Sequence, residues 1–204
     1  NTFGVLIFDG VNWMTLKTKG NKAARSIATD KNNNVIVGTK GDMGVISSDQ
    51  LHNIQYRSII HKKDRNKLEP DTVYEVLPLN TKSYFYRTTR ELYTFLNGRM
   101  KKINNPKNFR FGVSHLIGGK IYIYVSKHGL FNLIDGKLSI VAGTEVFKTK
   151  KQTIYGVFKQ KDRLVIVTRR AGIFYLKSGE LKRIKYDNKL IKNTTIYRAI
   201  SLRN

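Results

Sequence analysis

One phrase of about twelve residues recurs along this chain of 204 residues, and a repeat of this kind constrains the fold more than any single residue. Each copy carries an Asn-Gly, Asp-Gly or Ser-Gly pair at its centre. The glycines step by 38 residues (98 to 136) and then by 43 (136 to 179). A period near 40 indicates one supersecondary unit copied along the chain. The copies span 92–103, 130–141 and 173–184.

Each repeat contains four short stretches rich in β-branched and aromatic residues, as β-strands prefer. The second stretch ends in Thr or Ser, and the third and fourth are joined by the glycine pair, which suits a hairpin turn because glycine takes positive φ. Four antiparallel strands in about 40 residues form the blade of a β-propeller, so we predict an all-β propeller fold. A parallel β-helix has shorter coils, and a leucine-rich repeat needs an Asn ladder that is absent here.

The blades do not add up to a closed ring. Residues 1–16 match only the third and fourth strands of a blade, and residues 196–204 match only the start of the next one. We therefore predict a partial propeller of about four and a half blades, which leaves sheet edges exposed. Trp13, in the half blade, is expected to pack between blades. The four full blades are predicted at 24–60, 73–103, 113–141 and 154–184.

Composition excludes several classes of site. The chain has no cysteine, which rules out disulfides and thiolate metal sites, and no His pair has metal-ligand spacing, so we expect no metal. The glycines of 38–44 match neither a dinucleotide-binding nor a Walker motif, so we expect no cofactor. No apolar run approaches the ~20 residues of a membrane span. Because the chain opens on Asn, without a signal peptide, we interpret it as a piece of a longer protein.

The net charge of +24, from 38 Lys and Arg against 14 Asp and Glu, has two interpretations. One is a polyanionic partner, such as nucleic acid, an acidic glycan or a membrane surface. The other is a compositional bias, because Lys, Asn and Ile are all abundant and the basic residues are scattered rather than clustered in blocks.

Propeller topology would gather part of this scattered charge on one face. The turns between second and third strands carry basic residues in all four blades, and they share a face with the connections between blades, which are also basic. We hypothesise that this face binds an anionic ligand; the alternative is solvated turn charge. The candidate residues are Lys40, Arg90, Lys127, His128, Arg169 and Arg170.

A second candidate set lies on the first strands, which line the central channel of a propeller. We align these strands on Ala24, Val73, Val113, Ile154 and Ile196, which makes His115 equivalent to Glu75. Successive residues face opposite ways, so only one set can point into the channel. The alternative is that the tyrosines fill space between blades. The channel-lining candidates are Arg25, Tyr74, His115, Tyr155, Tyr197 and Arg198.

Three segments resemble the two-component regulator propeller repeats, which read as a strand ending in Asp, a turn, and an apolar strand ending in Gly-Thr. They are Gly-Val-Leu-Ile-Phe-Asp-Gly-Val-Asn-Trp (4–13), Arg-Ser-Ile-Ala-Thr-Asp (25–30) and Asn-Asn-Val-Ile-Val-Gly-Thr (33–39). The Phe-Asp-Gly-x-x-Trp opening is similar to Bacteroidetes-type sensor proteins that carry a triple-tyrosine domain after the propeller. Over 72–184 the resemblance is looser, because Gly-Thr becomes Arg-Thr, Val-Ser or Val-Thr.

The resemblance implies a periplasmic or otherwise extracytoplasmic sensory module of a membrane-anchored regulator. Members of such families often sense glycans, and the basic charge of this chain favours an anionic one. The other partner would be the downstream signalling domain of the same polypeptide (a histidine kinase, a transcription-factor domain or a cyclase). Nucleic acid is disfavoured, because it would call for a cytoplasmic location.

The leading interpretation is therefore a non-catalytic ligand-binding module for signal transduction. The alternative is a protein-interaction scaffold or dimerisation surface. A propeller-fold polysaccharide lyase or glycosidase comes third, because such enzymes need a Tyr/His/Arg or paired-carboxylate constellation, and the 14 acidic residues lie mostly at turns.

Overall fold

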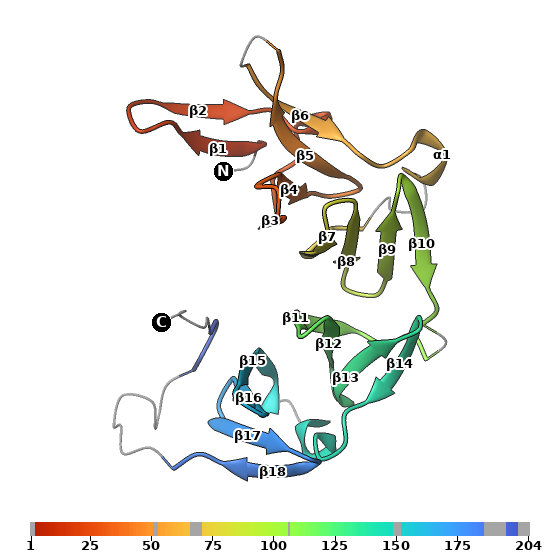
Figure 1. Ribbon diagram of the computed structural model, residues 1–204, viewed down its shortest axis with the longest axis vertical. Helices are drawn as coiled ribbons and strands as arrows, with labels where there is room; N and C mark the ends of the chain where they lie inside the picture. The colour runs from red at the N-terminus through yellow and green to blue at the C-terminus, as the bar shows by residue number, and fades with distance from the viewer. Residues whose placement is uncertain are drawn as a thin grey trace. The chain divides into compact units, whose positions relative to one another are not determined.

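The computed structural model describes residues 3–50, 53–65, 71–105, 107–148, 152–185 and 195–199. Its contacts divide the chain into two compact units, Asn1–Asn105 and Pro106–Asn204. Within each unit the sheets are antiparallel, with strands paired in chain order (Figure 1).

The first unit contains a two-stranded hairpin and two four-stranded sheets. A short 3-10 turn, Lys19–Asn21, follows the hairpin, and a single helical turn, α1 (Lys62–Arg65), follows the first four-stranded sheet. The hairpin is β1 (Val5–Phe8) and β2 (Trp13–Leu16); the sheets are β3 (Ser26–Thr29), β4 (Val35–Gly38), β5 (Met43–Ser48) and β6 (Ile54–Ser58), then β7 (Glu75–Asn80), β8 (Ser83–Arg87), β9 (Leu92–Leu96) and β10 (Arg99–Ile103).

The second unit contains two further four-stranded sheets, with a 3-10 turn, Glu145–Lys148, after the first of them. Four such sheets and a hairpin in the described part of the chain confirm the predicted partial propeller. The sheets are β11 (Phe111–Ile117), β12 (Lys120–Val125), β13 (Gly129–Ile134) and β14 (Lys137–Ile140), then β15 (Ile154–Gln160), β16 (Arg163–Thr168), β17 (Ile173–Lys177) and β18 (Glu180–Arg183).

The predicted hairpin turns between third and fourth strands are confirmed by their backbone angles. In each pair both residues have positive φ, 48–49° at the first and 75–82° at the glycine. Positive φ at both central residues is the requirement of a type I′ turn, whose twist matches that of the flanking strands. The pairs are Asn97-Gly98, Asp135-Gly136 and Ser178-Gly179.

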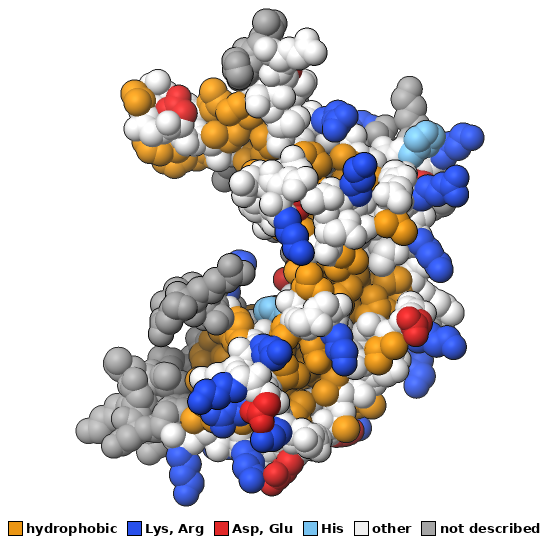
Figure 2. All heavy atoms as spheres, in the orientation of Figure 1, with side chains coloured by type: hydrophobic (Ala, Val, Ile, Leu, Met, Phe, Trp, Pro, Cys, Tyr) orange, Lys and Arg blue, Asp and Glu red, His pale blue; other side chains and the backbone are white. Residues whose placement is uncertain are grey.

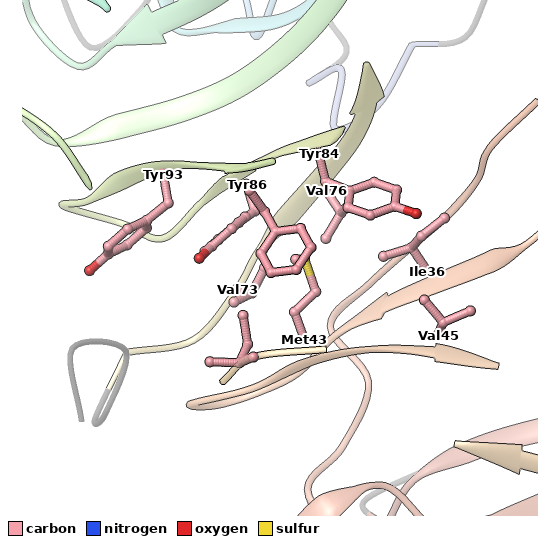
Figure 3. Close-up of a cluster of buried hydrophobic side chains, with 10 residues drawn as sticks. Ile36, Met43, Val45, Val73, Val76, Tyr84, Tyr86 and Tyr93 are labelled. Atoms are coloured by element: carbon pink, nitrogen blue, oxygen red, sulfur yellow. The ribbon is translucent and has the colours of Figure 1, made fainter. Parts of the chain in front are cut away.

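The cores lie between neighbouring sheets rather than within one sheet. In the first unit, Ile36, Met43 and Val45 of one sheet pack against tyrosines of the next (Figure 3). The rings of Tyr86 and Tyr93 stack with centroids 5.1 Å apart. The corresponding cluster of the second unit is more aliphatic and consists of Tyr124, Leu130, Phe147, Ile154, Val157, Ile166 and Leu176.

The alignment of the third repeat is wrong. β11 begins at Phe111, which pairs with Val125, and an irregularity then shifts the register so that Ser114 pairs with Ile123. His115 pairs with Tyr122, near the other end of the strand, and is not equivalent to Glu75, which pairs with the last residue of β8. By its pairing, Phe111 is the residue equivalent to Glu75, so the strand starts earlier than the alignment on apolar residues placed it. A short apolar pattern fits more than one offset, and the pairing with β12 decides between them.

Two further expectations concern the ends of the chain. The prediction that Trp13 packs between blades is wrong, because its ring is 65% exposed and stacks on Phe8 with centroids 4.7 Å apart. The two-stranded sheet that carries it offers few neighbours to cover the ring. Of the expected start of a next blade, residues 200–204 lie outside the described part, and residues 195–199 form no strand.

Candidate functional site

The cationic turns are built by a threonine at the end of the second strand. In three sheets its backbone amide donates to a carbonyl three or four residues later, at 2.9–3.0 Å, and its side chain is fully buried. These bonds close the turn, so the basic residues that follow the threonine point away from the core. The threonines are Thr39, Thr88 and Thr168, and the exposed cations are Lys40, Arg90 and Arg170.

In the first unit each cationic turn contacts the connector that follows its sheet. The Gly41 amide donates to the Asp71 carbonyl at 2.7 Å, and Lys40 forms a β-bridge with Thr72. The Asn105 side-chain amide donates to the Arg90 carbonyl at 2.9 Å. Turns and connectors therefore share one end of the sheets, as the topology predicts.

In the second unit the structure brings together two turn candidates and one channel candidate. The Arg169 guanidinium carbon lies 5.7 Å from the centroid of the Tyr197 ring, and the Ile196 amide donates to the Arg169 carbonyl at 2.9 Å. The Nε of Arg170 donates to the Thr195 hydroxyl at 3.1 Å. This segment thus meets the turn as Thr72 and Val73 meet the turn of Lys40 in the first unit.

The other turn of the second unit contacts the connector that precedes its sheet, because the Ser126 amide donates to the Arg110 carbonyl at 2.8 Å. Lys127 is exposed and has a φ of 63°. The His128 ring lies against Phe109, with centroids 4.7 Å apart, and its Nδ1 is 2.8 Å from the Ser126 carbonyl oxygen.

The remaining channel candidates occupy unlike environments. In the first unit, Arg25 is exposed and Tyr74 is half exposed. In the second, Tyr155 is the extra residue of an irregularity between Ile154 and Gly156, His115 contacts the Phe158 ring, and Arg198 is exposed. No single interpretation of the tyrosines, as channel lining or as filling between sheets, describes all of them.

An ion pair on the inner strands of the first unit was missed from the sequence. Arg87 is buried, and its guanidinium lies 3.2 Å from the Glu75 carboxylate. Burial lowers the pKa of Arg87, and the charge of Glu75 partly offsets that effect. The sequence did contain a signal for this pair, since the second strand ends in Gly38-Thr39 in one repeat and in Arg87-Thr88 in the next. A basic residue at a buried position requires a partner.

Two grooves at the opposite ends of the strands from the cationic turns were also missed. One, of about 760 Å³, lies between the two sheets of the first unit and is lined by Arg57, Lys82 and Tyr84 among others. The other, of about 700 Å³, lies between the two sheets of the second unit and includes the turn Lys161-Asp162. The signal was the dense charge of residues 159–163, which belongs to the turn between first and second strands.

Within the described ranges, no group of three His, Asp or Glu side chains could hold a metal ion. No helix among the described residues is long and apolar enough to cross a membrane.

No family model matches the chain, and no curated protein matches it in sequence. Solved structures do match. A catalytically inactive variant of virginiamycin B lyase from Staphylococcus aureus, with quinupristin, has a TM-score of 0.63 at 13% identity, over 88% of this chain and 61% of that one. YCF48 bound to a D1 peptide also has a TM-score of 0.63, at 10% identity, over 90% and 60% of the two chains.

The extracellular domain of the putative hybrid two-component system BT4673 from B. thetaiotaomicron matches over 97% of this chain and 33% of that one, with a TM-score of 0.54 at 15% identity. The chain has a β-propeller fold. It spans about 60% of the lyase and a third of the BT4673 domain. At these identities the likeness establishes the fold, and it agrees with the resemblance to two-component regulator propellers seen in the sequence.

Proposed function

We propose that this chain is a non-catalytic, ligand-sensing segment of a bacterial signal-transduction regulator that works outside the cytoplasm. The observation that carries the proposal is the match of almost the whole chain to the extracellular domain of a putative two-component system. The Phe-Asp-Gly-x-x-Trp and Gly-Thr motifs, which resemble those of regulator propellers, support it independently of the structural match.

The proposed ligand is an anionic glycan that binds at the cationic turns. Within each unit these turns lie beside the connectors, and Lys40, Arg90, Lys127 and Arg170 are exposed. Exposed cations on one face give a local positive potential that attracts polyanions. Binding would bias the packing of the propeller and thereby the output of a downstream domain in the same polypeptide.

An array of sulfated, uronate-containing and neutral oligosaccharides, probed with the full chain, tests this proposal. We expect selective binding of anionic glycans, and a loss of about tenfold in affinity when Arg90, Lys127 and Arg169 are replaced together by Gln. Unchanged binding by this variant would refute the turn face as the site. Turnover of any bound glycan would show that the module is an enzyme.

A protein-interaction scaffold is the second candidate, because the β1–β2 hairpin exposes large apolar side chains. Trp13 is 65% exposed and Phe8 50%, and Val11 at the hairpin turn is 82% exposed. An exposed apolar cluster of this kind is typical of a surface that contacts another protein. Light scattering of the chain and of a Trp13→Ser variant separates the candidates, since a dimer lost in the variant would favour the scaffold.

A further inference from the structure

The groove of the second unit has the dimensions of a ligand site. Its volume of about 700 Å³ lies within the range of about 300–1,000 Å³ typical of small-molecule pockets. The β11–β12, β15–β16 and β17–β18 turns surround it. Its apolar lining includes Leu176, which is 5% exposed, together with Ile117, Val141 and Leu164.

The charged side chains of this groove are almost all cationic. Lys177 Nζ lies 2.5 Å from the carboxylate of Asp162, the one acidic residue in the lining, and both side chains are about 60% exposed. None of the other four cations forms an ion pair within the described part of the chain. The groove therefore has an excess of four positive charges. Its cations are Lys120, Lys159, Lys161, Arg163 and Lys177.

Arg163 differs from the lysines of the groove because its guanidinium is engaged by an aromatic ring. Its guanidinium carbon lies 3.8 Å from the centroid of Tyr175. Tyr175 pairs with Val165 and therefore faces the side of the sheet opposite to Leu164 and Leu176, which line the groove. Arg163 thus adds to the positive potential around the groove, and the lysines are the cations placed to contact a ligand inside it.

The groove of the first unit provides an internal comparison. It lies at the same ends of the strands and has a similar volume, about 760 Å³, but its lining carries two cations, Arg57 and Lys82. If the cations only reflected a lysine-rich composition, the two grooves should carry similar numbers of them, so composition alone does not explain this difference. In the view of Figure 2, Lys and Arg side chains are spread over both units, so the difference between the two grooves is one of lining residues and not of overall surface charge.

We propose that the groove of the second unit binds a small molecule that carries at least two oxyanion groups, such as an oligophosphate or a polycarboxylate. Ammonium and guanidinium groups donate charge-assisted hydrogen bonds to these oxygens. The apolar lining lowers the local dielectric constant and strengthens each of these interactions. Several cations around one opening favour a multivalent anion over a monovalent one. The site does not depend on the proposed glycan face, because the two lie at opposite ends of the strands.

Isothermal titration of the full chain with inorganic tripolyphosphate and with citrate, at about 0.15 M salt, tests the site. We expect one of these probes to bind, and Lys159→Gln with Lys161→Gln to weaken that binding about tenfold. Arg57→Gln with Lys82→Gln is the matched control, because it removes the same charge from the other groove and should change affinity by less than about twofold. The probe that binds distinguishes a phosphate from a carboxylate ligand.

Three outcomes overturn the proposal. Neither probe binds the wild-type chain, or the Lys159/Lys161 variant binds as tightly as the wild type, or both double variants lose affinity equally, which would assign binding to net charge. Circular dichroism of each variant verifies that it is folded. The Arg90/Lys127/Arg169 variant should bind the probe normally, so that failure of the glycan proposal and failure of this one remain distinct.

Discussion

The second sheets of the two units, β7–β10 and β15–β18, differ in chemistry at equivalent positions. Two residues before the turn threonine, the first of these sheets has Tyr86 and the other has Ile166. Their partners on the next strand are Tyr93 and Phe174. The strand order is identical, so the fold accepts either a stacked tyrosine pair or an aliphatic–aromatic pair.

The next residue along the second strand also differs in chemistry between these two sheets. Arg87 pairs with Glu75 across β7 and β8, whereas Val167 lies opposite Gly156 in the second unit. The first unit thus buries polar groups between its sheets, and the second places its charges around the groove at the strand ends. Blade geometry therefore depends on strand pairing and turn closure, and the side chains packed between the sheets can be polar or apolar.

The largest loss of stability is expected from replacing Tyr86 in the first unit. Tyr86→Ala should lower the free energy of unfolding by about 4 kcal/mol, because a fully buried aromatic side chain is replaced by a cavity. Urea denaturation of the full chain measures it. The Tyr86 hydroxyl is buried and has no hydrogen-bond partner among the described residues, so Tyr86→Phe should keep or raise stability, by up to about 1 kcal/mol. A loss in the Phe variant comparable to that in the Ala variant would contradict this account of the core.

The buried ion pair should give the next largest effect. Glu75→Leu leaves the Arg87 charge buried without its carboxylate and should cost about 3 kcal/mol. Replacing both residues by Leu should cost less than the single change, because an apolar pair needs no solvation. Chemical denaturation of the two single variants and the double variant gives the coupling energy. Additive losses would show that Arg87 does not depend on Glu75.

The fold was predictable from the sequence because its determinants are local. The period near 40, the threonine that closes the turn after the second strand, and the glycine pairs each specify a strand or a turn without reference to distant residues. The failures were non-local. The place of His115 depends on how β11 pairs with β12, and the exposure of Trp13 depends on how many strands accompany it.

The candidate sites show the same division. The shared end of turns and connectors followed from topology, and the contact between Lys40 and Thr72 agrees with it. The grooves were missed because each is assembled from turns of two sheets, separated by about 40 residues in sequence. Charges such as Lys120 and Lys159 are adjacent only once neighbouring sheets pack together.

Raising the pH should lower the free energy of unfolding by a smaller amount, through tyrosines of the first unit. Burial raises the pKa of Tyr93 from 10.0 to about 12, with added effects of Glu91 and Asp71. The stability that comes from keeping Tyr93 neutral is complete below pH 10 and is lost as the pH rises to about 12. We expect Tyr93 to contribute a loss of about 1 kcal/mol between about pH 9 and about pH 11, measured by urea denaturation, and Tyr86, whose pKa burial also raises, to add to it. Tyr93→Phe should reduce this loss, whereas a pH response unchanged in that variant would place the titrating group elsewhere.

The smallest effect is expected in the groove of the second unit, at its one carboxylate. The hydrogen bond from Lys177 lowers the pKa of Asp162, so this side chain is ionised at neutral pH and opposes an incoming anion. Asp162→Asn should therefore tighten tripolyphosphate binding about threefold at low salt, with less effect as the salt concentration rises. The thermal midpoint should stay unchanged, because an exposed ion pair contributes little to folding. Calorimetry at two salt concentrations makes the comparison. Weaker binding in the Asn variant would mean that Asp162 positions Lys177 for the ligand instead of repelling it, and the groove would then depend on its one acid as well as its cations.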